Sequence, residues 1–236
     1  MKTMHRTAAV PFSLAPFIAV ALVPMAAWAH QDVEIGIASG RLTTSGGVYP
    51  TGSLAGLVFE SEMIPGSPPS TNEPGFEAAI GTFQPGDKVR FDFVYQLLYW
   101  NGTVLAPPPS NLTVSFGSNS ATISGADTGG LPGFLIAEAG SQGDFHKDLD
   151  FSLQPDAAEG LYGIVLKLAP DAGTTGFSDS NRFLIGFVNG TVADVPGGLD
   201  AMVEVAAVPE PGTLALAAAG AAVLALAARR RRSRKA

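Results

Sequence analysis

One short segment gathers side chains that bind metal ions. It reads Gly143-Asp144-Phe145-His146-Lys147-Asp148-Leu149-Asp150-Phe151. Successive side chains of a β-strand point to opposite faces, so His146, Asp148 and Asp150 share one face, with Asp144 in phase beside them. Carboxylates gathered on one face repel each other unless water, hydrogen bonds or a cation compensate their charge. The nitrogen and oxygen donors suit a divalent metal ion such as calcium, manganese or zinc, and a solvated strand face is the alternative.

The second candidate ligand, His30, depends on processing of the N-terminus. Residues 1–29 have the pattern of a secretory signal peptide, with two basic residues, an apolar stretch and small residues at Ala27 and Ala29. Cleavage after Ala29 leaves His30 as the first residue of the exported chain. Its α-amine and imidazole can then chelate one metal ion together.

A pairing of His30 with His146 would supply three nitrogen ligands, which resembles the copper site of histidine-brace proteins. Copper favours nitrogen ligands in a square-planar or tetragonal geometry. The chain would then be a copper-dependent polysaccharide oxidase. The alternative is that signal cleavage leaves an arbitrary polar residue, and that the two histidines never meet. Because the chain has no cysteine, Cys-based catalysis and Cys-ligated zinc are excluded. No residues form a full catalytic set, and we expect no enzyme.

The elements that must position these residues are predicted to be β-strands. Short stretches alternate between apolar and polar residues or are continuously apolar, and turn-forming residues separate them. The alternating stretches are Val33–Ile37, Val89–Phe93 and Leu112–Phe116, and the continuous ones are Leu161–Leu168 and Phe183–Val188. Because no window between the two ends shows a helical period beyond one turn, we predict an all-β domain over residues 30–200. A β-sandwich is favoured, with a β-barrel as the alternative.

Three segments of this region are predicted to lack regular structure. Residues 62–77 contain four prolines, and residues 125–143 are rich in glycine, so both are expected to be long loops. Residues 201–208 are interpreted as a linker to the C-terminus.

The region between the two ends is strongly acidic. Residues 30–208 carry six basic and twenty acidic side chains, a net charge of −14, whereas the whole chain carries −7. Such a surface repels nucleic acid, which is therefore excluded as a partner. The lack of cysteine also means that stability must come from burial and strand pairing rather than from disulfides.

The C-terminus consists of three parts. Val208-Pro209-Glu210-Pro211 is a motif that cannot continue a helix, residues 213–228 carry no charge, and residues 229–236 contain six basic side chains. The apolar part is predicted to be a transmembrane helix. Its sixteen residues span about 24 Å, short of the bilayer core of about 30 Å, but flanking arginines can snorkel. The basic tail should stay cytoplasmic.

This tail, residues 209–236, closely resembles the PEP-CTERM sorting signal. The resemblance implies an exosortase substrate that is anchored transiently in the inner membrane and then passed to the cell surface or the extracellular matrix. Its partners would be exosortase, the secretion machinery and exopolysaccharide or other surface components. We therefore expect an exported protein with a structural or adhesive role, for example in a biofilm. The alternative is a metal-binding module that uses His146, Asp148 and His30.

The region between the ends resembles a group of bacterial surface-anchored β-domains. In that group an H-x-D-like start and an H-x-H segment precede a G-x-Y strand. The matching residues here are His30-Gln31-Asp32, His146-Lys147-Asp148 and Gly160-Leu161-Tyr162. This chain has Asp148 where the group has its second histidine. The resemblance implies a surface location and a metal-binding face, but no reaction.

Overall fold

The structure is a computed structural model, and it describes residues 32–47, 57–127 and 130–207. The predicted signal peptide with Ala27 and Ala29, and the candidate ligand His30, lie outside these residues. So do the motif Val208, Pro209, Glu210 and Pro211 and the predicted membrane helix at 213–228. The predictions for both ends of the chain therefore rest on the sequence.

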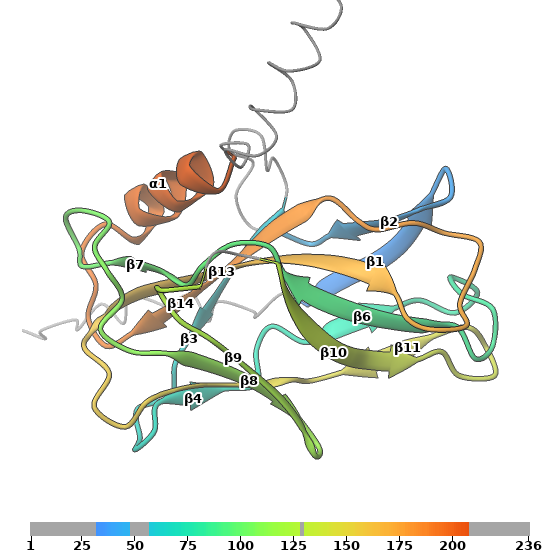
Figure 1. Cartoon of the computed structure of the whole chain (residues 1–236), viewed down its shortest axis with the longest axis horizontal. Coiled ribbons are helices and arrows are strands. Elements are labelled where there is room, and N and C mark those ends of the chain that lie inside the picture. The colour runs from blue at the N-terminus through green and yellow to red at the C-terminus, as the bar shows by residue number, and fades with distance from the viewer. Residues whose placement is uncertain (1–31, 48–56, 128–129, 208–236) are drawn as a thin grey trace, which may run out of the picture.

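Sheet A carries the histidine segment and has four strands (Figure 1). Across the sheet, the strand order is β11 (Phe145–Lys147), β5 (Phe76–Ala78), β1 (Val33–Ala38) and β2 (Arg41–Ser45). β1 and β5 run parallel, and the other neighbours run antiparallel. Strands that are far apart in the sequence thus meet in one small sheet.

Two further sheets complete the described part of the domain. Sheet B has the order β10 (Leu131–Glu138), β6 (Lys88–Phe93), β13 (Gly160–Pro170), β14 (Arg182–Asn189) and β3 (Val58–Glu62), and β7 (Leu98–Trp100) also pairs with β13. Sheet C has the order β4 (Ser70–Thr71), β12 (Asp150–Leu153), β8 (Leu112–Phe116) and β9 (Asn119–Ile123). The predicted all-β class is confirmed. Because each sheet is open in the described residues, the barrel alternative is not formed there.

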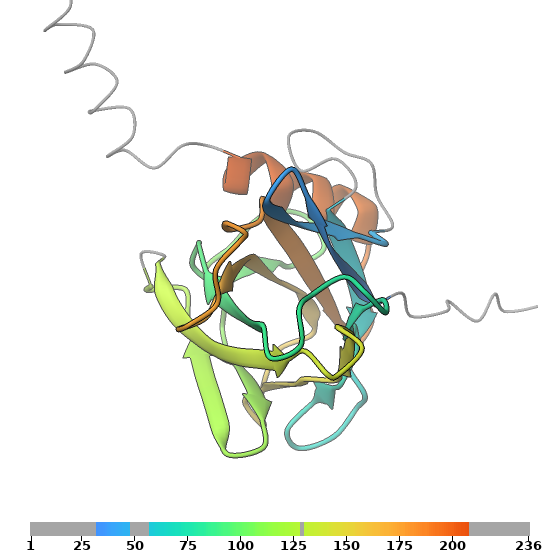
Figure 2. The same ribbon diagram turned by 90° about the vertical axis from the view of Figure 1, so that its right-hand side faces the viewer.

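The three sheets enclose one main hydrophobic core, around which the strands are arranged in the end-on view of Figure 2. Aromatic side chains fill much of it and are almost completely buried, among them Phe76 from sheet A, Phe91 and Phe187 from sheet B and Phe151 from sheet C. Burial of large apolar side chains is the main source of stability in a domain without disulfides.

The central strands β13 and β14 are buried on both faces, which explains their continuously apolar sequences. One face contributes to the main core. The other lies under helix α1 (Val195–Ala207), in a second cluster of buried side chains. Figure 2 shows α1 on the outside of the sheet. The prediction that these two stretches are central strands is confirmed.

Helix α1 corrects the linker predicted for residues 201–208. Its buried side chains, Leu199, Met202, Val203 and Ala206, follow the spacing of a helix face. Asp194 caps the first turn, since the Gly197 amide donates to its carboxylate at 3.1 Å. The sequence obscured this helix because a proline and two glycines open it, although proline is tolerated in a first turn.

The two predicted loops are also partly wrong. Residues 62–77 contain strand β4 and the start of β5, and residues 125–143 contain β10. β4 and β5 are two and three residues long. Such short strands have no periodicity of their own, and only their partners in the sheet define them.

Candidate functional site

His146 stands in a row of polar side chains on the outer face of sheet A. It lies directly opposite Glu77 on β5, and Glu77 lies beside Glu34 on β1. The neighbouring residues Phe145 and Phe76 alternate with them and are buried in the core. Alternation along three strands therefore places one imidazole and two carboxylates side by side on the opposite face.

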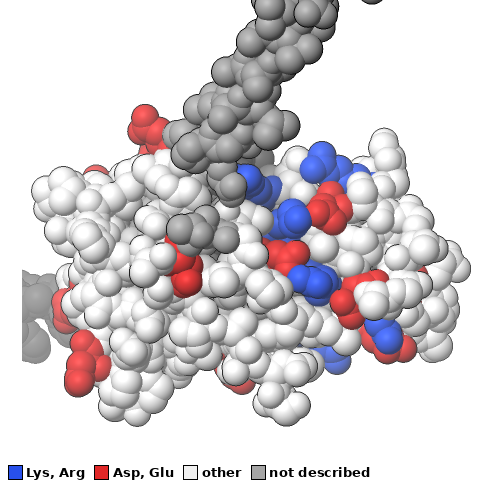
Figure 3. Space-filling view, viewed as in Figure 1, with Lys and Arg blue, Asp and Glu red and all other residues white. Residues whose placement is uncertain are grey.

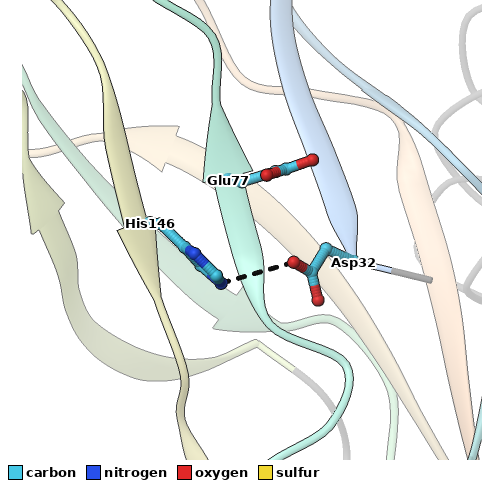
Figure 4. A group of neighbouring side chains, drawn as sticks. All are labelled: Asp32, Glu77 and His146. Carbon is cyan, nitrogen blue, oxygen red and sulfur yellow. Dashed lines mark ion pairs between the residues drawn. The ribbon is translucent and has the colours of Figure 1, made fainter. Parts of the chain in front are cut away.

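The imidazole contacts two further carboxylates. Nε2 of His146 lies 3.3 Å from Oδ2 of Asp32 and 3.1 Å from Oδ1 of Asp148. One donor atom each from Asp32, Glu77 and His146 lie within 4.8 Å of one another. Figure 4 shows the three residues side by side, with Glu77 and His146 on neighbouring strands and Asp32 at the start of β1. The His146 side chain is 57% exposed and that of Asp32 is 23% exposed, so the group is open to solvent on one side.

Gly75 lies against the carboxylates of Asp32 and Asp148. Its amide donates to Oδ1 of Asp32 at 3.0 Å, and its carbonyl accepts from the Val33 amide at 2.8 Å. A Cβ atom at this position would lie 2.7 Å from Oδ1 of Asp148 and 2.9 Å from Oδ1 of Asp32. Real Cβ atoms essentially never come so near, so a side chain at position 75 would displace the two carboxylates from their present positions.

The predicted set of ligands is therefore brought together in part. His146 and Asp148 are in contact, but the chain leaves sheet A after Lys147 and enters sheet C at β12. Asp150 lies there, paired with Ser115 on β8, and is not one of the grouped donors. The copper brace remains a prediction, because His30 lies outside the described residues.

Sequence reasoning missed two of the donors, Asp32 and Glu77. Both are distant from His146 in the sequence. The antiparallel pairing of β11 with β5 brings Glu77 opposite His146, and the parallel pairing of β1 with β5 brings Asp32 near it. Asp32 did stand in the quoted H-x-D start, two residues before Glu34 and thus in phase with it. No local pattern marked Glu77, because β5 has three residues and lay inside a predicted loop.

No lysine or arginine in the described residues forms an ion pair with Asp32, Glu77 or Asp148. Lys147 turns away from them and places Nζ 5.8 Å from the centre of the Phe116 ring. Other basic side chains pair elsewhere, as in Lys88–Glu138 and Lys167–Asp179. Figure 3 shows basic and acidic side chains interleaved in one band on a face of the molecule. Among the described residues, no lysine or arginine neutralises the carboxylates beside His146.

This arrangement can coordinate a divalent cation. Carboxylate oxygens and one imidazole nitrogen are ligands for calcium, manganese or zinc, with calcium the least dependent on the nitrogen. The exposure of the imidazole leaves coordination positions for water.

Known proteins inform the tail but not the β-domain. The family model of the PEP-CTERM protein-sorting motif matches residues 207–232. No curated protein and no solved structure matches the chain. Within residues 32–207, as far as they are described, no helix has the length and hydrophobicity to cross a bilayer.

Proposed function

We propose that this PEP-CTERM chain is an exported β-sandwich protein that exosortase processes, and that its role at the cell surface or in the extracellular matrix is structural or adhesive rather than enzymatic. The match of the sorting motif to residues 207–232 carries the proposal. The acidic, cysteine-free composition supports it, because such a domain is soluble and folds without disulfide chemistry after export.

The two ends of the chain have separate tasks in this proposal. The signal peptide at residues 1–29 directs export, and residues 213–228 hold the precursor in the inner membrane with the basic tail in the cytoplasm. Removal of the C-terminal segment then releases the domain to the surface or matrix, where exopolysaccharide and surface components are its partners.

Processing in cells tests the sorting step. In cells with active exosortase, the chain should lose its C-terminal segment and appear in the surface or matrix fraction. Cells lacking exosortase should retain it in the inner membrane. Glu210→Ala should cause the same retention, whereas Asp156→Ala, at an exposed position in the turn after β12, should not. Stable full-length protein in the inner membrane of the exosortase-positive cells would refute the pathway.

The structural or adhesive role is tested by deletion. Cells lacking the chain should bind less matrix polysaccharide or adhere less, and the exported protein should restore this. Restoration by a precursor that stays in the inner membrane would argue against a role outside the cell.

A second candidate function is divalent-cation binding. One observation favours it: donor atoms of Asp32, just before β1, of Glu77 on β5 and of His146 on β11 lie within 4.8 Å of one another, and Asp148 also contacts the imidazole. Calorimetric titration of the processed protein with calcium, manganese and zinc tests this function. A dissociation constant below about a millimolar for one of them supports it, since extracellular calcium modules bind in that range. No binding of any of the three refutes it.

A further inference from the structure

The folded domain and the sorting motif are directly adjacent in the chain. Helix α1 ends at Ala207, and the matched sorting motif begins at the same residue. Val208-Pro209-Glu210-Pro211 follows without any intervening residue. The linker that the sequence predicted at residues 201–208 would have separated the domain from the motif, but the helix occupies residues 201–207.

The last turns of α1 are firmly packed on sheet B. Met202, Val203 and Ala206 are buried, with at most 4% of each exposed. Met202 lies over Gly163 of β13, where an added Cβ would come within 2.4 Å of its sulfur atom. Nη1 of Arg182 on β14 donates to the carbonyl of Ala206 at 3.5 Å, close to the end of the helix. The residues just before the motif are thus part of the folded domain.

An enzyme that processes a peptide must reach the main chain on both sides of the bond. In the last turn of a helix the amide groups donate to carbonyls of the preceding turn, although the last four carbonyls have no partner within the helix, and a packed helix face is covered by its sheet. Processing of folded protein therefore depends on local opening of the segment next to the bond.

We propose that the last turn of α1, Val203–Ala207, controls access of exosortase to the sorting motif, so that this turn must unwind before folded precursor is processed. The proposal rests on the proposed exosortase pathway. Helix α1 would then link folding of the domain to its release from the membrane. Exosortase would process precursor with undocked α1 quickly and precursor with docked α1 slowly. Unwinding exposes Val203 and Ala206, so the open form should be about tenfold to a hundredfold less populated than the docked form.

Insertion of a linker into the full-length chain tests the proposal. Six residues, Gly-Ser-Gly-Ser-Gly-Ser, are placed between Ala207 and Val208, and loss of the membrane-held precursor is followed by pulse-chase in cells with active exosortase. We expect processing about tenfold faster than for the unmodified chain, because the enzyme no longer has to open α1. The matched control carries the same six residues after Gly190, in an exposed turn, and should be processed at the original rate.

A second pair of variants changes the stability of the turn without adding residues. Val203→Gly removes a buried side chain and lowers helix propensity, and it should speed processing. Glu204→Ala, at the exposed neighbouring position, raises helix propensity and should slow it slightly. Thermal unfolding of each purified processed domain verifies that sheet B remains folded.

The outcomes separate this proposal from the sorting pathway itself. If the unmodified chain is processed but the linker changes nothing, or the control insertion speeds processing equally, control by α1 is refuted and the pathway stands. If the unmodified chain is not processed by active exosortase, the pathway fails, and the proposal fails with it.

Discussion

Nε2 of His146 lies 3.1 Å from Oδ1 of Asp148, at the point where the chain crosses from sheet A to sheet C. The contact keeps the two outward side chains together although β11 has ended at Lys147. The next outward residue, Asp150, already belongs to the other sheet. The place where the chain passes from sheet A to sheet C therefore determines that Asp148, and not Asp150, lies beside the imidazole of His146.

Cation binding should depend on His146 and not on Asp150. We expect His146→Ala to weaken the binding of manganese or zinc at least about tenfold, because the single nitrogen donor is lost. Glu77→Gln should weaken calcium, manganese and zinc alike, since it removes a negative charge from the group. Asp150→Asn, the matched control, should change the dissociation constant less than about twofold. Calorimetry on the processed protein gives all three values.

Equal effects of Asp150→Asn and Glu77→Gln would contradict this assignment. They would mean that the overall acidity of the domain, rather than the group beside His146, attracts the cation. Raising the salt concentration distinguishes the two cases, because diffuse attraction is screened whereas direct coordination is affected less.

Gly75→Ala should destabilise the domain. Its Cβ would meet the carboxylates of Asp148 and Asp32 at 2.7 and 2.9 Å, so both aspartates or the turn must move. Both atoms are the ends of flexible side chains, but a shift of Asp32 disturbs its hydrogen bond from the Gly75 amide, so we expect a loss of about 1 kcal/mol in the free energy of unfolding. Urea denaturation measures it. Gly140→Ala is the control, because its nearest neighbour is the side chain of Asp144 at 3.3 Å, which can shift. Equal stability of the two variants would show that the Gly75 turn tolerates a side chain.

The sequence predicted strands well where one element carried its own pattern. Leu161–Leu168 was recognised as a central strand because burial on both faces leaves almost no polar residue in β13. Prediction from the sequence failed where a strand is defined only by its pairing with another strand. β5 has three residues, and nothing local revealed that Glu77 would lie opposite His146. Helix α1 was missed because it opens with Pro196, Gly197 and Gly198, which are poor helix formers, and packing on the sheet beneath stabilises it.

Alkaline pH should unfold the domain through Tyr162. Burial raises the pKa of this phenol well above its usual value near 10, and the neighbouring Tyr99 adds to the shift. The unfolded chain thus loses the proton first, so stability is complete below about pH 10 and falls as the pH rises above it. Urea denaturation at pH 8 and at pH 10.5–11 should show this decrease.

Tyr162→Phe separates the two roles of the phenol. At pH 8 it should cost about 1 kcal/mol, because the hydrogen bond from the Tyr162 hydroxyl to the Ala158 carbonyl is lost. Between pH 8 and pH 11 its stability should fall less than that of the unmodified protein. Tyr95→Phe, at a partly exposed position, should leave the unmodified pH dependence in place. If the stability of Tyr162→Phe falls as much between pH 8 and pH 11 as that of the unmodified protein, other groups cause the loss of stability.

Gly198→Ala should weaken the docking of α1, although the same change stabilises an ordinary helix interior by about 1 kcal/mol. The added Cβ would lie 2.8 Å from Cγ and Cδ1 of Trp100 and 2.9 Å from Cδ2 of Leu161. We expect a net loss of about 1–3 kcal/mol, because the helix must move away from its sheet to make room.

Trp100 reports this movement directly. Trp28 lies in the predicted signal peptide, so Trp100 is the single tryptophan of the exported chain. Its fluorescence should shift to the red in Gly198→Ala as water reaches the indole, whereas Glu204→Ala on the exposed face should leave the spectrum unchanged. A stabilised variant with an unshifted spectrum would show that Gly198 does not contact Trp100. It would mean that α1 accommodates a larger side chain at its interface with the sheet without moving.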